Sequence, residues 1–337
     1  MDLFDARTYL KIDIANSAGF DKLTWQERID WFDQNQANLL PLMAQAEDPA
    51  LYFAGITAWS DVLQGSPIGY TISLDATSSG LQLLAVLTGD RKAAEICNVV
   101  DTGKRRDAYT EVYKHMLGKT GDTSKIKRED TKAAIMTALY GSTAMPKRVF
   151  GEGELLAHFE DSMGELTPGC WELNKAFLAL WDPTATAYSW VLPDNFHVHV
   201  KVMDSVVETV HFLNEPFDVI SKVNAPVEQG RSLGANTIHS LDGMIVREMT
   251  RRCNYNPKRV EALFGWLNTG HAGTRFECPD DEMVQILWGH YQKSGYLSAR
   301  ILDHLLPENL GHVDPATILE LLETLPEKPF KVLSIHD

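Results

Sequence analysis

The sequence of 337 residues has few cysteines and no long apolar run. Its four cysteines, Cys97, Cys170, Cys253 and Cys278, are far apart and show no CxxC spacing, which excludes a disulfide framework and argues against a zinc site. No stretch of about 18 apolar residues is present, and the N-terminus MDLFDARTYLK lacks the regions of a secretory signal. We therefore expect a cytoplasmic protein with free thiols and no membrane association.

Glycine-rich phosphate loops are also absent. MLGKTGD contains GKT, but the earlier glycine of a Walker loop would fall on Tyr113. FGEGELL is a similarly weak match. A nucleotide, if the chain binds one, must be held by another arrangement.

The charge is unevenly distributed. The net charge of −15 argues against a general affinity for nucleic acid, which depends on neutralising phosphates. Residues 91–148, however, contain 13 Lys and Arg against 7 Asp and Glu, a local charge of +6 that leaves −21 for the remainder. An anionic partner is therefore expected to contact the middle of the chain.

Residues 128–142, REDTKAAIMTALYGS, have the composition of a helix. Acidic residues stand at its positive end, no proline interrupts it, and its only glycine comes near the end, where glycine is preferred. At about 100° per residue, Arg128, Lys132, Met136 and Tyr140 share one face. Two cations and a phenol suit a nucleotide triphosphate and its sugar, although a solvated basic face with a buried tyrosine is the alternative.

Residues 70–75, YTISLD, form a short β-rich run that ends on Asp75. The following ATSSG leads into an apolar helix, LQLLAVL. A strand that ends on an aspartate, before small hydroxylated residues that open a helix, commonly presents a carboxylate in a cleft. The alternative is that Asp75 caps the following helix.

The rest of the chain is predicted to be mainly helical. The predicted segments are a loop over residues 11–22, a helix with a capping box formed by Thr24 and Glu27, a helix over 48–64, a β-hairpin over 187–203, a loop with His239 and Asp242 that leads into a basic helix ending at 252, an acidic helical region over 256–328 and a strand over 330–337.

Five segments occur in a fixed order: ANSAGFDKLTWQERI, DATSSGLQ, RxxxKxxxMTxxYGS, IHSLDG and the terminal IHD. In this order they resemble the single-subunit RNA polymerases of phage and mitochondria. The clear matches cover about a quarter of the chain and are spread from end to end. The resemblance implies a nucleotidyltransferase that transcribes DNA, here phage genes in the host bacterial cytoplasm.

The resemblance also implies the fold, a helix-rich α/β (α+β) right-hand polymerase with palm and fingers and a small antiparallel palm sheet. Residues 1–90 would form the first part of the palm, and residues 91–230 the fingers with the helix 128–142. Residues 231–337 would form the second part of the palm, with 256–328 as a helical insertion. The N-terminal and thumb domains of the family are expected to be absent.

The chemistry implied by the resemblance uses two magnesium ions. Asp75 and Asp337 would hold two Mg²⁺ about 3.5–4 Å apart, with the backbone carbonyl of Ala76 as a further ligand. One ion would activate the primer 3′-hydroxyl and the other would stabilise the leaving pyrophosphate. Lys132 and Arg128 would bind the triphosphate and neutralise developing charge.

Selection of ribonucleotides is assigned by the same resemblance. Tyr140 and His239 would together recognise the ribose 2′-hydroxyl, and Gly141 would let the template base approach the helix end. The other residues expected near the nucleotide are Asp21, Lys22 and His336. Right-hand DNA polymerases are the nearest alternative, but they carry a glutamate soon after the first aspartate, and the residues after Asp75 are ATSSGLQ. We therefore expect rNTPs to be preferred over dNTPs.

Three departures from the family affect the interpretation. The family-like segments begin almost at Met1, the chain stops at Asp337, and His336 follows Asp242 after a long insertion. We expect a split polymerase that acts with DNA template, nascent RNA, rNTPs and a second polypeptide carrying the N-terminal half. Asp242 remains an alternative second metal ligand, and a non-catalytic polymerase-like binding subunit remains an alternative function.

Overall fold

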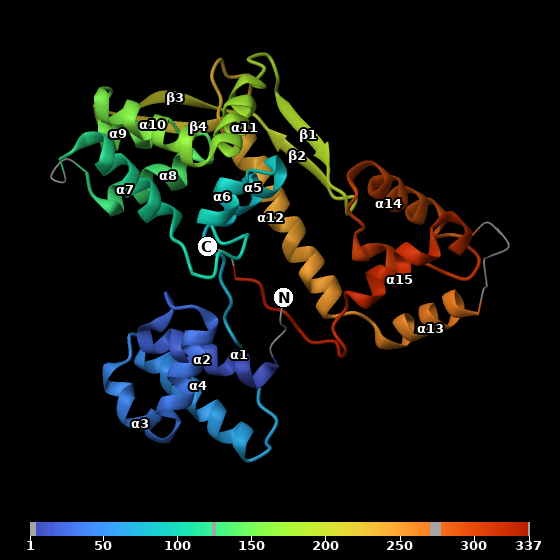
Figure 1. Cartoon of the computed structure of the whole chain (residues 1–337). Helices are drawn as coiled ribbons and strands as arrows, with labels where there is room; N and C mark the ends of the chain where they lie inside the picture. Colours follow the sequence, from blue (N-terminus) through green and yellow to red (C-terminus); the bar gives the residue numbers. More distant parts are fainter. Residues whose placement is uncertain (1–4, 123–125, 270–277, 336–337) are drawn as a thin grey trace. The chain divides into compact units, whose positions relative to one another are not determined.

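The computed structural model describes residues 5–122, 126–269 and 278–335, and it is rich in helices (Figure 1). Two compact units are formed. One comprises Met1–Lys132 and Glu152–Cys170, and the other Ala133–Gly151 and Trp171–Asp337. The predicted class, a helix-rich α+β fold with small antiparallel sheets, is confirmed. The predicted palm and fingers boundaries stay a prediction.

The first helices of unit 1 surround a core of their own. They are α1 (Ala6–Ala15), a π-helical turn (Asn16–Phe20), α2 (Trp25–Asn35), short 3₁₀ turns (Gln36–Asn38 and Met43–Gln45) on either side of α3 (Leu39–Leu42), and α4 (Pro49–Leu63). Phe32 and Tyr52 are fully buried between them. The predicted capping box is confirmed, because Thr24 and Glu27 bond each other's backbone amides. The loop predicted over 11–22 is wrong up to residue 20, because the apolar residues of α1 continue the helix into this core.

Residues 70–75 are extended but do not form the predicted strand. A strand requires a neighbouring strand for its backbone hydrogen bonds, and within the described residues none pairs with this segment. Instead, the buried carboxylate of Asp13 in α1 accepts hydrogen bonds from the Tyr70 hydroxyl at 2.7 Å and from the Ser73 amide at 3.3 Å. A side chain thus replaces the expected sheet partner.

The remaining helices of unit 1 follow this segment. They are α5 (Ser79–Thr88), α6 (Arg91–Ile96), α7 (Ala108–Thr120) and α10 (Glu154–Leu166), which packs on α7. Helix α8 (Arg128–Ala138) begins in unit 1 and ends in unit 2. The helices predicted over 48–64 and after ATSSG are confirmed as α4 and α5.

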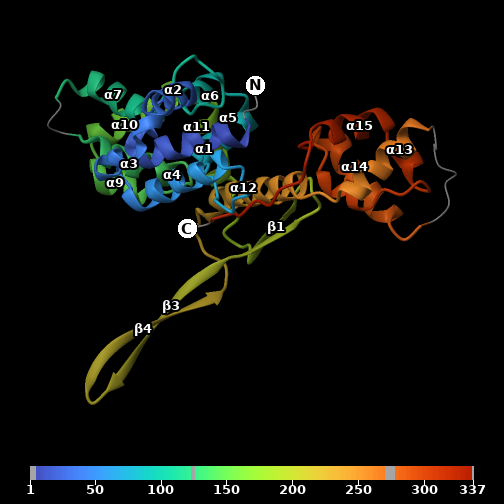
Figure 2. The same cartoon turned by 90° about the horizontal axis from the view of Figure 1, so that it is seen from below.

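Unit 2 contains both sheets. After α9 (Ala144–Phe150) and α11 (Pro168–Ala179), strands β1 (Ala187–Val191) and β2 (His197–Lys201) form the predicted hairpin. A second hairpin, β3 (Met203–Phe212) with β4 (Glu215–Asn224), projects beyond the first (Figure 2). The long helix α12 (Ser232–Cys253) follows.

The helical region predicted over 256–328 is confirmed for residues 256–269 and 278–328, and residues 270–277 lie outside the described residues. It comprises α13 (Pro257–Asn268), α14 (Asp281–Ser294), two 3₁₀ turns (Ala299–Asp303 and Leu310–His312) and α15 (Pro315–Glu323). Leu263, Leu287, Ile301 and Ile318 are fully or almost fully buried in its own core. This region is therefore a packed subdomain.

The predicted terminal strand is wrong for residues 330–335, which are extended without strand pairing. The Phe330 amide donates to the Cys253 carbonyl at 2.7 Å, and Leu333 and Ile335 are exposed. His336 and Asp337 lie outside the described residues. The described helices include none long and apolar enough to cross a bilayer.

Candidate nucleotide-binding site

Helix α8 has one buried and one open side. The buried stripe consists of Thr131, Ala134, Ile135 and Ala138. On the opposite side Lys132 and Met136 are exposed and Arg128 is partly exposed. The i, i+3, i+4 and i+7 spacing of the buried residues fixes the rotation of the helix and directs the Lys132 ammonium outward. The predicted position of the two cations on one accessible face is therefore confirmed.

The end of α8 explains the positions of Tyr140 and Gly141. The Gly141 amide donates to the Ala138 carbonyl and the Ser142 amide to the Thr137 carbonyl, a Schellman ending in which Tyr140 is the C-cap residue. Gly141 has φ of +84°, and a Cβ there would lie 3.1 Å from the Arg231 carbonyl. Only glycine meets both conditions easily, so the backbone turns directly after Tyr140.

Tyr140 and His239 come together, although they are far apart in the sequence. Their rings are parallel within 3° and their centroids are 5.0 Å apart. His239 is exposed on α12, so the predicted loop over 232–242 is wrong. The helix begins at Ser232 because Gly234 and Ile238 are buried and continue its apolar side. The stacked pair lies wholly within unit 2.

Arg128 is held by the first turn of α7. Its guanidinium donates to the Asp107 carboxylate and, through Nε, to the Thr110 hydroxyl at 2.8 Å. Burial alone would raise the pKa of Asp107, but the hydrogen bonds from Arg128 and Thr110 outweigh this effect and lower it. Asp107 also accepts the Tyr109 and Thr110 amides as the N-cap of α7. Arg128 therefore carries a bound carboxylate.

Lys132 differs from Arg128 in its surroundings. Its ammonium lies 5.6 Å from the centroid of the Tyr109 ring. Across the described ranges no carboxylate is within ion-pair distance of Lys132. A cation held by a ring face and open to solvent is available to an anionic ligand.

Asp75 is exposed in the middle of a segment that is held on both sides. Asp13 anchors the residues before it, and the Thr77 hydroxyl donates to the Cys97 carbonyl at 2.9 Å after it. The helix that follows begins after Ser78, so Asp75 does not cap it. The alternative prediction, that Asp75 caps the following helix, is therefore wrong.

Asp21 and Lys22 lie in an exposed turn. The Asp21 carbonyl accepts hydrogen bonds from Arg28 at 2.9 Å and Arg105 at 2.6 Å. Arg28 is a buried cation that also bonds the Leu23 carbonyl and the Asn16 side chain. The turn is consequently fixed by two guanidinium groups.

Two aspartates are the candidates for the second metal ligand, Asp337 and its alternative Asp242. Asp337 and His336 fall outside the described residues, and Asp242 is half-buried on α12. Within the described part of the chain, no three His, Cys, Asp or Glu side chains are grouped to hold a metal ion. His197 and His199 are exposed on one face of β2.

Sequence reasoning missed Asp107, Tyr109 and Asp13. Asp107 stands directly before a helix, a position that indicates an N-cap, but nothing in the sequence connects it with Arg128. Asp13 lies inside a helix and contacts residues much later in the chain. Only folding brings these groups together.

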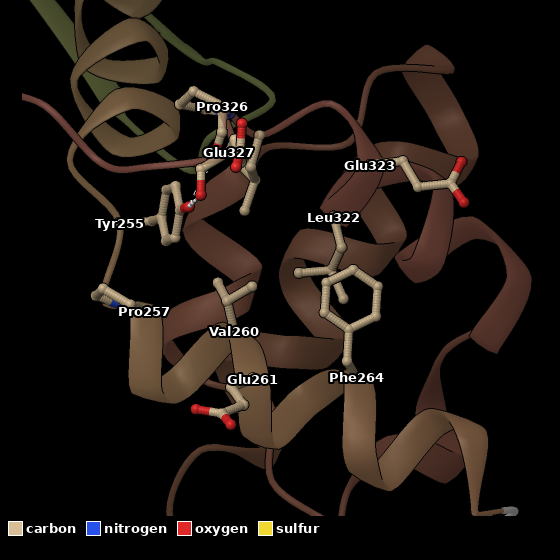
Figure 3. A pocket seen from close by; sticks show the side chains of 10 residues that line it. Tyr255, Pro257, Val260, Glu261, Phe264, Leu322, Glu323, Pro326 and Glu327 are labelled. Atoms are coloured by element: carbon tan, nitrogen blue, oxygen red, sulfur yellow. Dashed lines mark hydrogen bonds between the residues drawn. The ribbon is translucent and has the colours of Figure 1, made fainter.

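The described cleft in unit 2 lies elsewhere. It has a volume of about 430 Å³ and runs between α13 and the end of α15, where Phe264 and Leu322 lie close together and Glu261 and Glu323 lie to either side (Figure 3). None of the residues predicted for nucleotide or metal binding lines it. The cleft therefore belongs to the helical subdomain and not to the candidate site.

Residues 5–167 match the family model of DNA-dependent RNA polymerase. The chain is similar to phage and mitochondrial DNA-directed RNA polymerases. The resemblance inferred from the five segments is thereby confirmed. The matched residues include Asp75, Arg128, Lys132 and Tyr140, but not His239.

Three relatives give the extent of this similarity. The mitochondrial DNA-directed RNA polymerase of Neurospora crassa is 32% identical over 167 residues, which cover 42% of this chain and 12% of that protein. The DNA-directed RNA polymerase of Pseudomonas phage phiKMV is 26% identical over 173 residues, 40% of this chain and 21% of its own length. Mitochondrial DNA-directed RNA polymerase 1 of Arabidopsis thaliana is 25% identical over 226 residues, 54% of this chain and 23% of its own length. The chain thus spans less than a quarter of these relatives.

Proposed function

We propose that this chain is the catalytic part of a DNA-directed RNA polymerase and joins rNTPs on a DNA template. The stack of Tyr140 on His239 is the observation that carries the proposal. Two aromatic rings from distant segments, placed together beside the end of a helix with an exposed lysine, form a surface suited to a nucleotide sugar. The phenol and the imidazole can both exchange hydrogen bonds with a 2′-hydroxyl.

The residues of α8 provide the groups that bind the triphosphate. Lys132 contacts the phosphates as a mobile point charge, because its ammonium lies over the face of the Tyr109 ring, a contact that is easily exchanged for an anion. Arg128 is a weaker candidate for direct phosphate contact, because its guanidinium is bonded to Asp107. We therefore propose that Lys132 binds the triphosphate. The main role of Arg128 is to hold α8 in position through its bond to Asp107.

Magnesium fits the oxygen donors of the Asp75 segment. Mg²⁺ prefers carboxylates, carbonyls and substrate phosphates, and Asp75 and the Ala76 carbonyl lie in an exposed segment that is anchored at both ends. Asp337 is proposed as the second carboxylate. Bound there, Mg²⁺ would neutralise phosphate charge and activate the primer 3′-hydroxyl.

The proposed partners follow from the similarity to DNA-directed RNA polymerases and from the charge of the chain. They are a DNA template, the nascent RNA and a second polypeptide carrying the N-terminal polymerase half. A negative charge of −21 outside residues 91–148 is suited to a basic protein partner. Transcription of phage genes in a host cytoplasm is the setting that we propose.

Primer extension on a primed DNA template tests the proposal, because a primer removes the need for a promoter. The full chain is assayed with Mg²⁺, with and without a candidate second polypeptide, and with rNTPs or dNTPs in parallel. We expect rNTPs to be preferred, and Asp75→Asn or Lys132→Ala to reduce incorporation at least about a hundredfold. Comparable rates with rNTPs and dNTPs would remove the RNA polymerase assignment.

The stacked pair is tested separately. Tyr140→Phe and His239→Ala are expected to reduce the preference for rNTPs over dNTPs roughly tenfold each, because each removes a group that bonds the 2′-hydroxyl. The control is His211→Ala, which removes an exposed histidine from β3. Unchanged sugar preference in both variants would show that the stack is structural.

A further inference from the structure

One side chain of unit 1 contacts two elements of the candidate site. Tyr109 lies half-buried in the first turn of α7. Its ring lies beneath the Lys132 ammonium, 5.6 Å from the nitrogen. Its hydroxyl donates to the Ser78 hydroxyl at 3.2 Å, three residues after Asp75. We propose that Tyr109 is a positioning residue that couples the triphosphate-binding Lys132 to the metal-binding Asp75 segment, an inference that rests on the proposed function.

The first turn of α7 is well placed for this task, because it also holds the start of α8. Asp107 and Thr110 bond Arg128, one helical turn before Lys132. The side chains of Arg128 and Lys132 are adjacent on the same helix face, so fixing the first brings the second over the Tyr109 ring. The packing of α7 against α8 therefore sets the contact between Tyr109 and Lys132, and the contact does not depend only on the rotamer of a flexible lysine.

The interaction between Tyr109 and Lys132 is suited to an exchangeable ligand. The attraction between a solvent-accessible ammonium and a ring face is weaker than a charge-assisted hydrogen bond to a phosphate. The ring can thus restrict the ammonium without competing strongly with a triphosphate. Arg128 differs in this respect, because it forms an ion pair with Asp107, a stronger contact than the one between Lys132 and the ring.

The hydroxyl connects this arrangement with the Asp75 segment. Ser78 ends that segment, and Thr77 beside it is fixed by the Cys97 carbonyl. Gln82 donates to the same carbonyl at 2.8 Å and thereby fixes the start of α5. The Tyr109 hydroxyl is the additional contact that reaches across to α7. Removing only the hydroxyl should therefore disturb the metal end and leave the phosphate end in place.

Two substitutions separate these contacts. Tyr109→Phe keeps the ring beneath Lys132 and removes the bond to Ser78, whereas Tyr109→Leu removes both. Ser78→Ala removes the same bond from the other side. Tyr113→Leu is the matched control, a half-buried tyrosine one turn later in α7. Urea unfolding of each variant shows whether it is folded before binding is measured.

The measurement is calorimetric binding of ATP by the full chain over a series of Mg²⁺ concentrations. Tyr109→Leu should weaken ATP binding about twofold to fivefold at saturating Mg²⁺, the size expected of an exposed cation–π contact, and should add nothing in a Lys132→Ala background. Tyr109→Phe and Ser78→Ala should keep the affinity at saturating Mg²⁺ but require a higher Mg²⁺ concentration to reach it. Tyr113→Leu should change neither quantity.

The outcomes are distinguishable. Equal losses from Tyr109→Leu in the wild-type and Lys132→Ala backgrounds would show that Tyr109 acts only on folding, and would overturn the coupling. An unchanged Mg²⁺ requirement in both Tyr109→Phe and Ser78→Ala would overturn the link to the Asp75 segment. If the wild-type chain shows no ATP binding that depends on Lys132, the proposed function fails and this inference fails with it.

Discussion

Two buried carboxylates, Asp13 in unit 1 and Asp194 in unit 2, have similar burial and opposite surroundings. Asp13 is 5% exposed and is bonded by the neutral Tyr70 hydroxyl and Ser73 amide. Asp194 is fully buried and accepts from the guanidinium groups of Arg247 and Arg251. The first carboxylate has dipoles for partners and the second has charges.

This difference determines their ionisation. Burial raises the pKa of Asp13, and the hydrogen bonds from Tyr70 and Ser73 only partly oppose it. Burial would also raise the pKa of Asp194, but the hydrogen bonds and charges of Arg247 and Arg251 lower it below the ordinary value. A buried acid held by neutral donors therefore loses less on protonation than one that is held by two arginines.

The two carboxylates also hold different parts of the candidate site. Asp13 anchors the segment with Asp75. Asp194 lies between β1 and β2, joins them to α12, which carries His239, and its carbonyl accepts from Arg300 of the helical subdomain at 3.0 Å. Asp13 is therefore a local anchor, whereas Asp194 joins three elements.

The largest expected effect is that of Asp194→Asn. Because this change leaves the partly buried Arg247 without a counter-charge and leaves Arg251 with Glu248 alone, we expect the free energy of unfolding to fall by about 3–5 kcal/mol. Urea denaturation measures it. Asp303→Asn, at an exposed carboxylate in the helical subdomain, is the control and should change stability by less than about 0.5 kcal/mol. If Asp194→Asn lowered the free energy of unfolding no more than Asp303→Asn does, Asp194 would not be the residue that joins these elements.

Asp13→Asn is expected to have a smaller effect, about 1 kcal/mol or less, because the amide oxygen still accepts from Tyr70 and no charge needs a partner. Tyr70→Phe should cost about 1–3 kcal/mol at neutral pH, since it removes a hydrogen bond to a carboxylate. Urea denaturation with fluorescence detection checks both. If Asp13→Asn were as destabilising as Asp194→Asn, the contrast between dipolar and charged partners would be wrong.

The pH dependence should have opposite signs at the two sites. The contribution of Asp194 is present above its ordinary pKa near 3.8 and is lost as the pH falls through its lowered folded value. The contribution of Asp13 is present below that ordinary value and is lost as the pH rises through its raised folded value. The stability difference between wild type and each Asn variant, measured from pH 3 to pH 7, should therefore increase with pH for Asp194 and decrease for Asp13. Parallel curves would contradict the assignment.

The smallest effect is expected in the second extended segment. Residues 70–75 are held at several points, whereas residues 330–335 are joined to α12 by the bond from the Phe330 amide to Cys253. Phe330→Pro removes this donor and should lower stability by at most about 1 kcal/mol, while trypsin cleavage after Lys331 becomes faster. Leu333→Pro, in the exposed part of the segment, is the control. Equal cleavage rates in the two variants would show that the Phe330 bond does not hold the segment.

Much of the local structure could be predicted from the sequence. The helix over 128–138, the Gly141 ending, the Thr24 capping box and the β1–β2 hairpin depend on neighbouring residues, so their patterns are readable locally. The two predicted strands around Asp75 and before Asp337 are different. A β-rich run becomes a strand only when another strand pairs with it, and in residues 70–75 and 330–335 none does.

The sequence by itself determined the order of the polymerase-like segments, the face of α8 that carries Lys132 and the glycine that ends this helix, because spacing along one chain fixes these features. Tertiary structure alone decided that Tyr140 stacks on His239, that Asp107 bonds Arg128 and that Tyr109 lies between Lys132 and Ser78. These contacts join residues whose separation in sequence carries no periodic signal. They arise only when buried stripes on different helices set the rotation of each helix against its neighbours.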